Sequence, residues 1–161
     1  MAGPPTIFYK RATFVTHLPV AHLYSPSHAW LARSDDGHWR VGYTKFALRM
    51  LGELVDLQFD RPSGAPILPG EILGSIEGFK AVSDVYSVGD GTFLGGNPAL
   101  KDDIEGLARD PYVGGWLYAF EGRPDSRCLD VEAYQNLLNA TIDRILAQQK
   151  SEPESESEES A

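Results

Sequence analysis

Cysteine is nearly absent from this chain of 161 residues, which contains Cys128 alone. A single thiol excludes an intramolecular disulfide, and such low cysteine usage fits a reducing compartment. The chain has no run of about 18 apolar residues, the length that a helix needs to span a bilayer. Residues 1–26 lack the composition of a transit peptide, and they lack an apolar core followed by a secretory cleavage site. We therefore expect a cytoplasmic protein that does not enter a membrane.

Basic residues are also scarce, with 14 Lys and Arg against 23 Asp and Glu and a net charge of −9. Nucleic-acid binding needs a concentrated basic face, so the sequence predicts no nucleic-acid partner. Five of the acidic residues are glutamates within 150–161, a Ser/Glu stretch without apolar anchors. That composition predicts a disordered acidic tail.

The sequence lacks the common catalytic motifs. It contains no Gly-x-Ser-x-Gly elbow, no phosphate-binding Gly-x-x-x-x-Gly-Lys-Ser/Thr loop and no His-Glu-x-x-His helix. His17, His22, His28 and His38 follow no zinc-ligand spacing, so we interpret them as ordinary surface or strand histidines. No nucleophile–base pair or metal constellation can be assembled, and the chain is not expected to be an enzyme.

Short β-prone segments alternate with turns rich in Gly, Pro, Asn and Asp. The segments are 29–32, 38–43, 53–59, 71–77, 81–87 and 116–121. Short strands separated by turns at this rhythm predict an antiparallel sandwich or flattened barrel. No β-α-β unit recurs, so a parallel nucleotide-binding sheet is disfavoured.

Three helices are predicted between these segments. The first covers 45–51, with Thr44 as N-cap and Gly52 at its end. A second lies around 98–107. The third follows Asp130 as N-cap and runs from 131 to about 149, and an apolar stripe predicts that it packs on the β core. The stripe consists of Val131, Tyr134, Leu137, Leu138, Ile142 and Ile145.

One lysine stands at the tip of a predicted hairpin. Two β-prone runs flank the turn Glu77-Gly78-Phe79-Lys80-Ala81. Such a turn would present the amine of Lys80 to a modifying enzyme. Taken alone, the segment is better explained by an ordinary solvated lysine.

Six short motifs in the expected order resemble the H-protein family of the glycine cleavage system, over roughly 23–138. They are S-P-S-H-A-W at 25–30, V-G-Y-T at 41–44, L-G-E-L-V at 51–55, E-G-F-K-A-V-S-D at 77–84, N-P-A-L at 97–100 and D-P-Y-V-G-G-W at 110–116. Each motif is weak alone. Their common order and spacing make the resemblance specific.

The resemblance implies a mainly β fold, a lipoyl-domain-like sandwich of two small antiparallel sheets (a barrel-sandwich hybrid) with peripheral helices and a C-terminal helix. This domain would cover 23–149, after a partly β-prone extension at 1–22 and before the tail at 150–161. The resemblance further implies that Lys80 carries covalent lipoate, and that Glu77, Asp84 and Ser27 serve the arm or its attachment.

The function implied by the resemblance is that of a non-catalytic lipoyl carrier in glycine catabolism. A lipoyl group alternates between a cyclic disulfide and a dithiol, so it can carry both electrons and a carbon fragment. The family shuttles an aminomethyl group and reducing equivalents between a pyridoxal-phosphate glycine decarboxylase, a tetrahydrofolate-dependent aminomethyltransferase and a flavin dihydrolipoyl dehydrogenase. A lipoate ligase or lipoyl transferase attaches the arm.

Three departures from the family pattern keep alternatives open. Ala29 stands where the family has a glutamate that contacts the loaded amine, and Gly78 and Phe79 replace serine and valine beside the lysine. An H-like lipoyl carrier of another pathway, such as sulfur oxidation or lipoyl relay, therefore stays possible, as does an unmodified interaction protein on the same fold. A biotin carrier is disfavoured, because Phe79 and Ala81 stand where that family has methionines.

Overall fold

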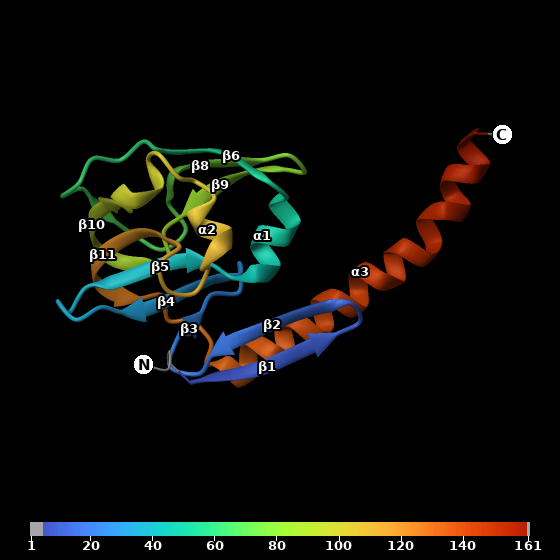
Figure 1. The fold of residues 1–161 in the computed structure, drawn as a ribbon, viewed down its shortest axis with the longest axis horizontal. Coiled ribbons are helices and arrows are strands. Elements are labelled where there is room, and N and C mark those ends of the chain that lie inside the picture. The colour runs from blue at the N-terminus through green and yellow to red at the C-terminus, as the bar shows by residue number, and fades with distance from the viewer. Residues whose placement is uncertain (1–4, 161) are drawn as a thin grey trace.

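The computed structural model describes residues 5–160. Antiparallel strands form three sheets (Figure 1). The six-stranded sheet joins, in spatial order, β3 (Leu23–Tyr24), β4 (Ala29–Arg33), β5 (Trp39–Tyr43), β11 (Trp116–Pro124), β10 (Gly89–Gly96) and β7 (Pro66–Ile67). The three-stranded sheet joins β6 (Leu54–Phe59), β8 (Ile72–Gly78) and β9 (Val82–Tyr86), and β1 (Thr6–Arg11) pairs with β2 (Phe14–Pro19). The predicted mainly β fold of two antiparallel sheets is confirmed, and the β1–β2 hairpin adds a third.

Helices lie around these sheets. They are α1 (Lys45–Leu51), the 3-10 turn η1 (Pro98–Leu100), α2 (Gly106–Arg109) and α3 (Val131–Ser160). The caps that the sequence predicts are present: Thr44 accepts the N–H of Ala47, and Asp130 accepts the N–H of Ala133. Within residues 5–160, no helix has both the length and the apolar character required to cross a bilayer.

The prediction of a single helix around 98–107 is wrong, because the structure has two separate short helices, η1 and α2, in this region. Asp102 and Asp103 lie between them, and aspartate favours turns over helix interiors.

Strand β10 was not predicted, since its glycines indicated turns. Gly91 of β10 lies opposite Gly122 of β11, and a Cβ on Gly91 would lie 1.9 Å from the carbonyl oxygen of Glu121. These glycines therefore permit a close approach of two strands.

Strand β4 is buried on both faces. Ala29 and Leu31 belong to the core between the two larger sheets, which also holds Ile76 of β8 and Phe120 of β11. Trp30 points to the opposite face and joins a second core with α3 and the hairpin. Continuous apolar strands are typical of sheets that are covered twice.

The second core consists mainly of aromatic and aliphatic side chains from six elements, β1 to β4, α1 and α3. Its buried members are Tyr9, Phe14, Leu18, Tyr24, Trp30, Phe46, Tyr134, Leu138 and Ile142. Figure 1 shows the β1–β2 hairpin lying along the first half of α3, whose second half projects from the body. The hydroxyl of Tyr9 donates to Asn139 Oδ1 at 2.8 Å, and Arg11 Nε donates to Asp143 Oδ1 at 3.0 Å. The apolar stripe of α3 thus packs on the sheet, as predicted, and on the hairpin as well.

The predicted extension at 1–22 begins with residues 1–4, which lie outside the described residues, as does Ala161. The sequence predicts disorder for 150–161, whereas the backbone of α3 continues to Ser160. Extending an existing helix requires no new nucleation and glutamate is a good helix former, whereas Pro153 within this stretch lacks a backbone N–H and disfavours a helix interior. The division of the chain at residues 22 and 150 stays a prediction.

His28 is half-buried and packs against other side chains. Its Nδ1 lies 2.9 Å from the hydroxyl of Tyr134, which is also 2.8 Å from Thr44 Oγ1. Its ring lies against Phe46 with the ring centroids 4.7 Å apart. Burial lowers the pKa of His28 to about 4. The imidazole is therefore neutral at pH 7, and its protonation opposes folding.

This burial predicts that the protein loses stability as the pH falls. Between the unfolded pKa of about 6.5 and the folded pKa of about 4, the unfolded chain binds the proton and the folded protein does not. We expect the free energy of unfolding in urea to fall by about 2 kcal/mol from pH 7 to pH 5 on account of His28. His28→Asn should lose that part of the pH dependence, while His17→Asn, at an exposed histidine, should keep it. An equal pH dependence in all three proteins would contradict the prediction.

Candidate functional site

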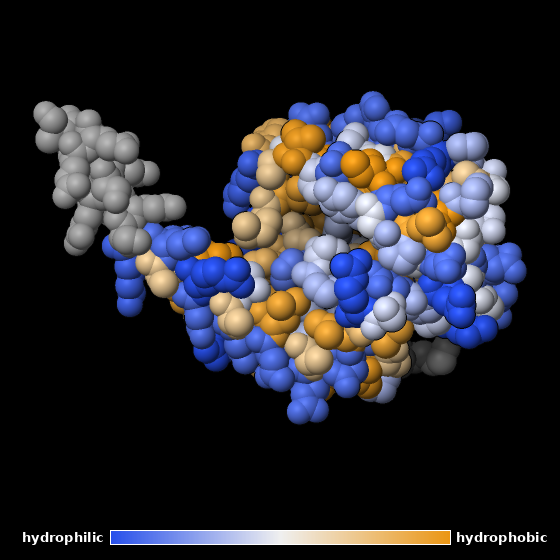
Figure 2. Space-filling view, turned by 180° about the vertical axis from the view of Figure 1, so that it is seen from behind, coloured by the Kyte–Doolittle hydropathy of each residue, from blue (hydrophilic) through white to orange (hydrophobic). Residues whose placement is uncertain are grey.

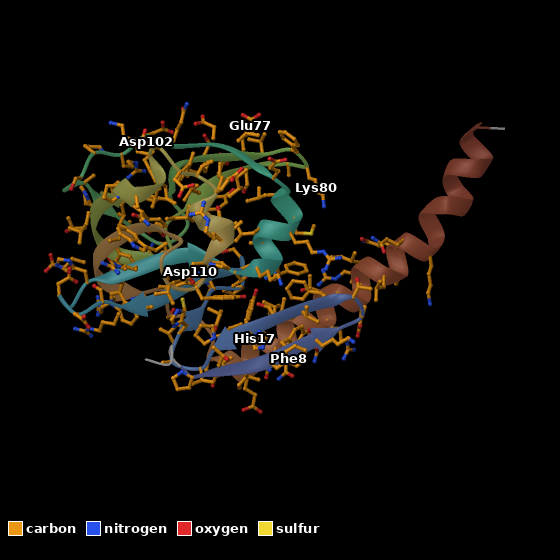
Figure 3. The ribbon with its side chains drawn as sticks, in the orientation of Figure 1. Phe8, His17, Glu77, Lys80, Asp102 and Asp110 are labelled. Atoms are coloured by element: carbon orange, nitrogen blue, oxygen red, sulfur yellow. The ribbon has the colours of Figure 1, made fainter. Side chains whose placement is uncertain are left out.

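Lys80 lies at the tip of the hairpin that joins β8 and β9. Figure 3 shows it at the end of this hairpin beside α1, with Glu77 further back along β8. Lys80 is exposed, and the neighbouring Phe79 leaves 75% of its surface open to solvent. The structure therefore has Lys80 exposed at a hairpin tip, as the sequence predicts.

The turn beneath Lys80 is tied to the end of α1. Three consecutive backbone N–H groups are paired: that of Gly78 donates to Ala81, that of Phe79 to Glu53 and that of Lys80 to Leu51, each over 2.9 Å. Paired backbone groups hold the loop in one conformation. The side chain of Lys80 can move, while its Cα has a fixed place.

Two glycines make this anchoring possible. A Cβ on Gly78 would lie 2.2 Å from the carbonyl oxygen of Leu51, the acceptor of the Lys80 N–H. Gly52 has φ +76, and a Cβ there would lie 2.8 Å from Lys80 Cγ. The stem of Lys80 therefore lies over Gly52. Gly78, which departs from the serine of the family pattern, is required here by the close approach of Leu51.

Carboxylates line the outer face of the small sheet. In adjacent strands Glu77 lies opposite Val82 and Asp84 opposite Ser75, so Glu77 and Asp84 are diagonal neighbours on one face, a separation of about 7–8 Å in antiparallel pairs. Asp56 of β6 lies opposite Glu77 on its other side. Adjacent like charges do not stabilise a sheet. The acidic surface beside the lysine is therefore better suited to contact with another molecule.

Asp84 also lines a small cavity between β9 and the large sheet. Its volume is about 140 Å³, and Ser27, Ala29 and Tyr43 contribute to its wall. Burial raises the pKa of the Tyr43 phenol, with smaller contributions from Tyr86 and from the charge of Asp84. The structure thus brings Ser27 and Asp84 together, as the sequence predicts. Glu77 and Lys80 are not part of this wall.

Ala29 is only 5% exposed in this cavity. The family's glutamate position is therefore an interior position here and not an exposed strand end. Among the described residues that line the cavity, Asp84 is the one carboxylate. Tyr43, Ser83 and Tyr86 also line it, and the sequence did not indicate them, because nothing in their local pattern distinguishes them from other strand residues.

The remaining candidate groups show no second reaction centre within residues 5–160. No cluster of three or more His, Cys, Asp and Glu side chains there could hold a metal ion. His22 is buried, and its Nε2 lies 2.8 Å from the carbonyl oxygen of Tyr112. Burial raises the pKa of the Cys128 thiol to about 11, which keeps it protonated and unreactive at neutral pH.

Comparison with known proteins identifies the family of this chain. The family model described as glycine cleavage H-protein matches residues 22–143. The chain belongs to the glycine cleavage H-protein family. It is 35% identical over 128 residues to the glycine cleavage system H proteins of Citrobacter koseri and Salmonella paratyphi B, and each alignment covers 77% of this chain and 98% of the relative. The crystal structure of the H protein from Mycobacterium marinum is similar with a TM-score of 0.66 and 33% identity, over 74% of this chain and 97% of that one.

The family match begins after the β1–β2 hairpin and ends within α3. The resemblance found in the sequence motifs is confirmed, and the family implies a carrier protein of the glycine cleavage system. The residues present fit a covalent lipoyl group on Lys80, because the lysine is exposed and its backbone N–H is anchored. The bulky Phe79 is largely exposed and is not part of either core.

The close approach at Gly78 predicts a site-specific loss of stability. Gly78→Ser should push the carbonyl of Leu51 away and weaken its hydrogen bond with the N–H of Lys80, at a cost of about 1–3 kcal/mol in the free energy of unfolding. Hydrogen exchange should show faster exchange of the Lys80 amide. Gly106→Ser is the matched control, because its nearest neighbour would be 3.4 Å away. Equal stability and exchange in the two variants would contradict the role given to Gly78.

Proposed function

We propose that this chain is a lipoyl carrier of the glycine-cleavage type, which shuttles an aminomethyl group and reducing equivalents on Lys80. Its proposed partners are a pyridoxal-phosphate glycine decarboxylase, a tetrahydrofolate-dependent aminomethyltransferase, a dihydrolipoyl dehydrogenase and a lipoate ligase or lipoyl transferase. The observation that carries the proposal is an exposed lysine on an anchored hairpin tip in a chain of the H-protein family. The proposed compartment is the cytoplasm.

The chain's own residues supply attachment, presentation and electrostatics. When bound, the lipoyl group supplies a disulfide that can be reduced to a dithiol. The anchored turn holds the Cα of Lys80 in place, so that an arm on it stays at high effective concentration for successive partner sites. Glu77, with Asp56 beside it, gives the turn a negative surface that a ligase can recognise. Ser27 and Asp84 offer acceptors for an amine in the small cavity.

Intact mass after co-expression with a lipoate ligase tests the attachment. Wild type should gain the mass of one lipoyl group, and Lys80→Arg should gain none, because arginine keeps the charge but has no amine that the ligase can acylate. Lys101→Arg, another exposed lysine, should be modified like wild type. An unmodified wild type, alongside an H protein that is modified in the same cells, would refute the proposal and favour an unmodified interaction protein.

Ala29 favours a second candidate of the same build, an H-like lipoyl carrier in another pathway such as sulfur oxidation or lipoyl relay. The family's carboxylate at this place is absent, and Asp84 alone among the described residues gives the small cavity a negative charge. An amine held there would therefore lack one ionic partner. The two candidates differ in whether glycine decarboxylase can load the arm.

Loading with glycine separates these candidates. If the carrier serves glycine cleavage, lipoylated wild type should gain a glycine-derived mass when it is incubated with glycine decarboxylase and glycine. Ala29→Glu should then retain that mass longer, because a second carboxylate would lie in the same cavity as Asp84. Ala29→Gln is the matched control for size without charge. No loading of either wild type or Ala29→Glu, with a reference H protein loaded in parallel, would favour the other pathway.

A further inference from the structure

A second and larger hollow opens on the other side of Lys80. It has a volume of about 340 Å³ and lies between α1, the tip of the β1–β2 hairpin and α3. Its apolar wall comes from Phe14, Phe46, Met50, Ile142, Ile145 and Leu146, and Lys80 itself forms part of the rim. Figure 2 shows hydrophobic side chains gathered around a hollow between the rounded body and the base of the projecting helix. We call this hollow the hairpin groove.

The hairpin groove depends on parts of the chain that lie outside the family match of 22–143. The hairpin tip comes before the match, and Ile145 and Leu146 come after it. Two contacts hold the walls in place: Arg11 pairs with Asp143 through an Nε–Oδ1 distance of 3.0 Å, and the rings of Phe14 and Phe46 meet edge to face at 5.6 Å. The groove is therefore formed without any ligand.

The charge around the hairpin groove is opposite to that of the small cavity. Arg11, Arg49 and Lys80 line it, and none of the described lining residues is acidic. Asp143 compensates Arg11 at the outer edge, whereas the guanidinium of Arg49 lies over the ring of Phe14 at 5.8 Å. A protonated amine is disfavoured next to the guanidinium of Arg49, because lipoylated Lys80 is neutral and Arg11 is paired with Asp143. An uncharged apolar group meets no such repulsion in the hairpin groove.

The hairpin groove and the small cavity also differ in volume. Sites that hold small molecules usually measure about 300–1,000 Å³ and are lined mainly by apolar side chains. The hairpin groove, at about 340 Å³, falls within that range, and the small cavity, at about 140 Å³, does not. Lys80 lines the hairpin groove and is not part of the wall of the small cavity.

We propose that the hairpin groove is the resting site of the chain's own uncharged lipoyl arm, formed by the β1–β2 hairpin and the end of the apolar stripe of α3. This inference rests on the proposed lipoylation of Lys80. The groove selects the arm by state: the apolar methylenes and dithiolane ring are accepted, and an arm that carries an ammonium group is repelled by Arg49. The hairpin thus shields the uncharged arm between partners.

Methyl NMR of the full chain tests the position of the arm. Intact mass first establishes that Lys80 is lipoylated. In the lipoylated protein we expect nuclear Overhauser effects between arm protons and the methyl groups of Ile142, Ile145 and Leu146, which lie in the hairpin groove. Effects to Val88 and Leu117, which line the small cavity, would overturn the inference, and so would an arm without contacts to either set.

Reduction kinetics give an independent readout with matched variants. Dithiothreitol transfers two electrons and two protons to the dithiolane S–S bond and closes to its own cyclic disulfide. An arm that is buried for about nine-tenths of the time reacts about tenfold more slowly than a free arm. Met50→Asp with Leu146→Asp should therefore speed the reduction several-fold, because both substituted side chains are exposed at the groove. Leu68→Asp, at an equally exposed but remote leucine, should leave the rate unchanged.

The outcomes distinguish the two proposals. A protein without the lipoyl mass refutes the proposed function and this inference together. A lipoylated protein whose arm is reduced as fast in wild type as in the groove variant refutes the resting site alone. Slow reduction in wild type, fast reduction in the groove variant and arm contacts to the α3 methyl groups support it.

Discussion

Strand β4 of the large sheet is apolar on both faces, and the positions of α3 and the β1–β2 hairpin follow from the need to cover it on its second face. Leu31 faces the three-stranded sheet, while Trp30, the next residue along β4, faces α3 and the β1–β2 hairpin. Even Gly42 in the neighbouring strand serves this packing, since a Cβ there would lie 2.5 Å from the Trp30 ring. Helix α1 lies at the junction of the two cores, with Leu48 in one and Phe46 in the other. Its end is therefore fixed from both sides, and it is this end that accepts the N–H of Lys80.

Two different environments lie beside the β8–β9 hairpin that carries Lys80. One is the small cavity with Asp84 and Ser27, and the other is the larger hairpin groove, which Lys80 itself lines. Ala29 leaves Asp84 as the one carboxylate among the described residues of the small cavity, while the β1–β2 hairpin adds the second environment. Neither feature alters the backbone hydrogen bonds that anchor the turn of Lys80. Under the proposed function, the surroundings of the arm can therefore differ while its attachment point stays the same.

Local chemistry predicted several elements correctly. Thr44 and Asp130 cap helices as expected, and the hairpin tip with Lys80 lies between the predicted strands. Predictions failed where distant contacts override local preference. The glycines of β10 indicated turns, but they serve a close pairing with β11. The histidines were interpreted as ordinary surface or strand residues, whereas His28 lies in a turn and contacts Tyr134 and Phe46.

The sequence by itself determined the mainly β class, the ends of α1, the start of α3 and the place of Lys80 at a hairpin tip, because capping and turn chemistry act over a few residues. Only the tertiary structure decided that Ala29 is an interior position, that Gly78 must be a glycine, and that a hairpin from one end of the chain and a helix from the other enclose a groove beside Lys80. Burial and cavities arise from contacts between residues far apart in the chain. No local pattern in either segment encodes the other's position.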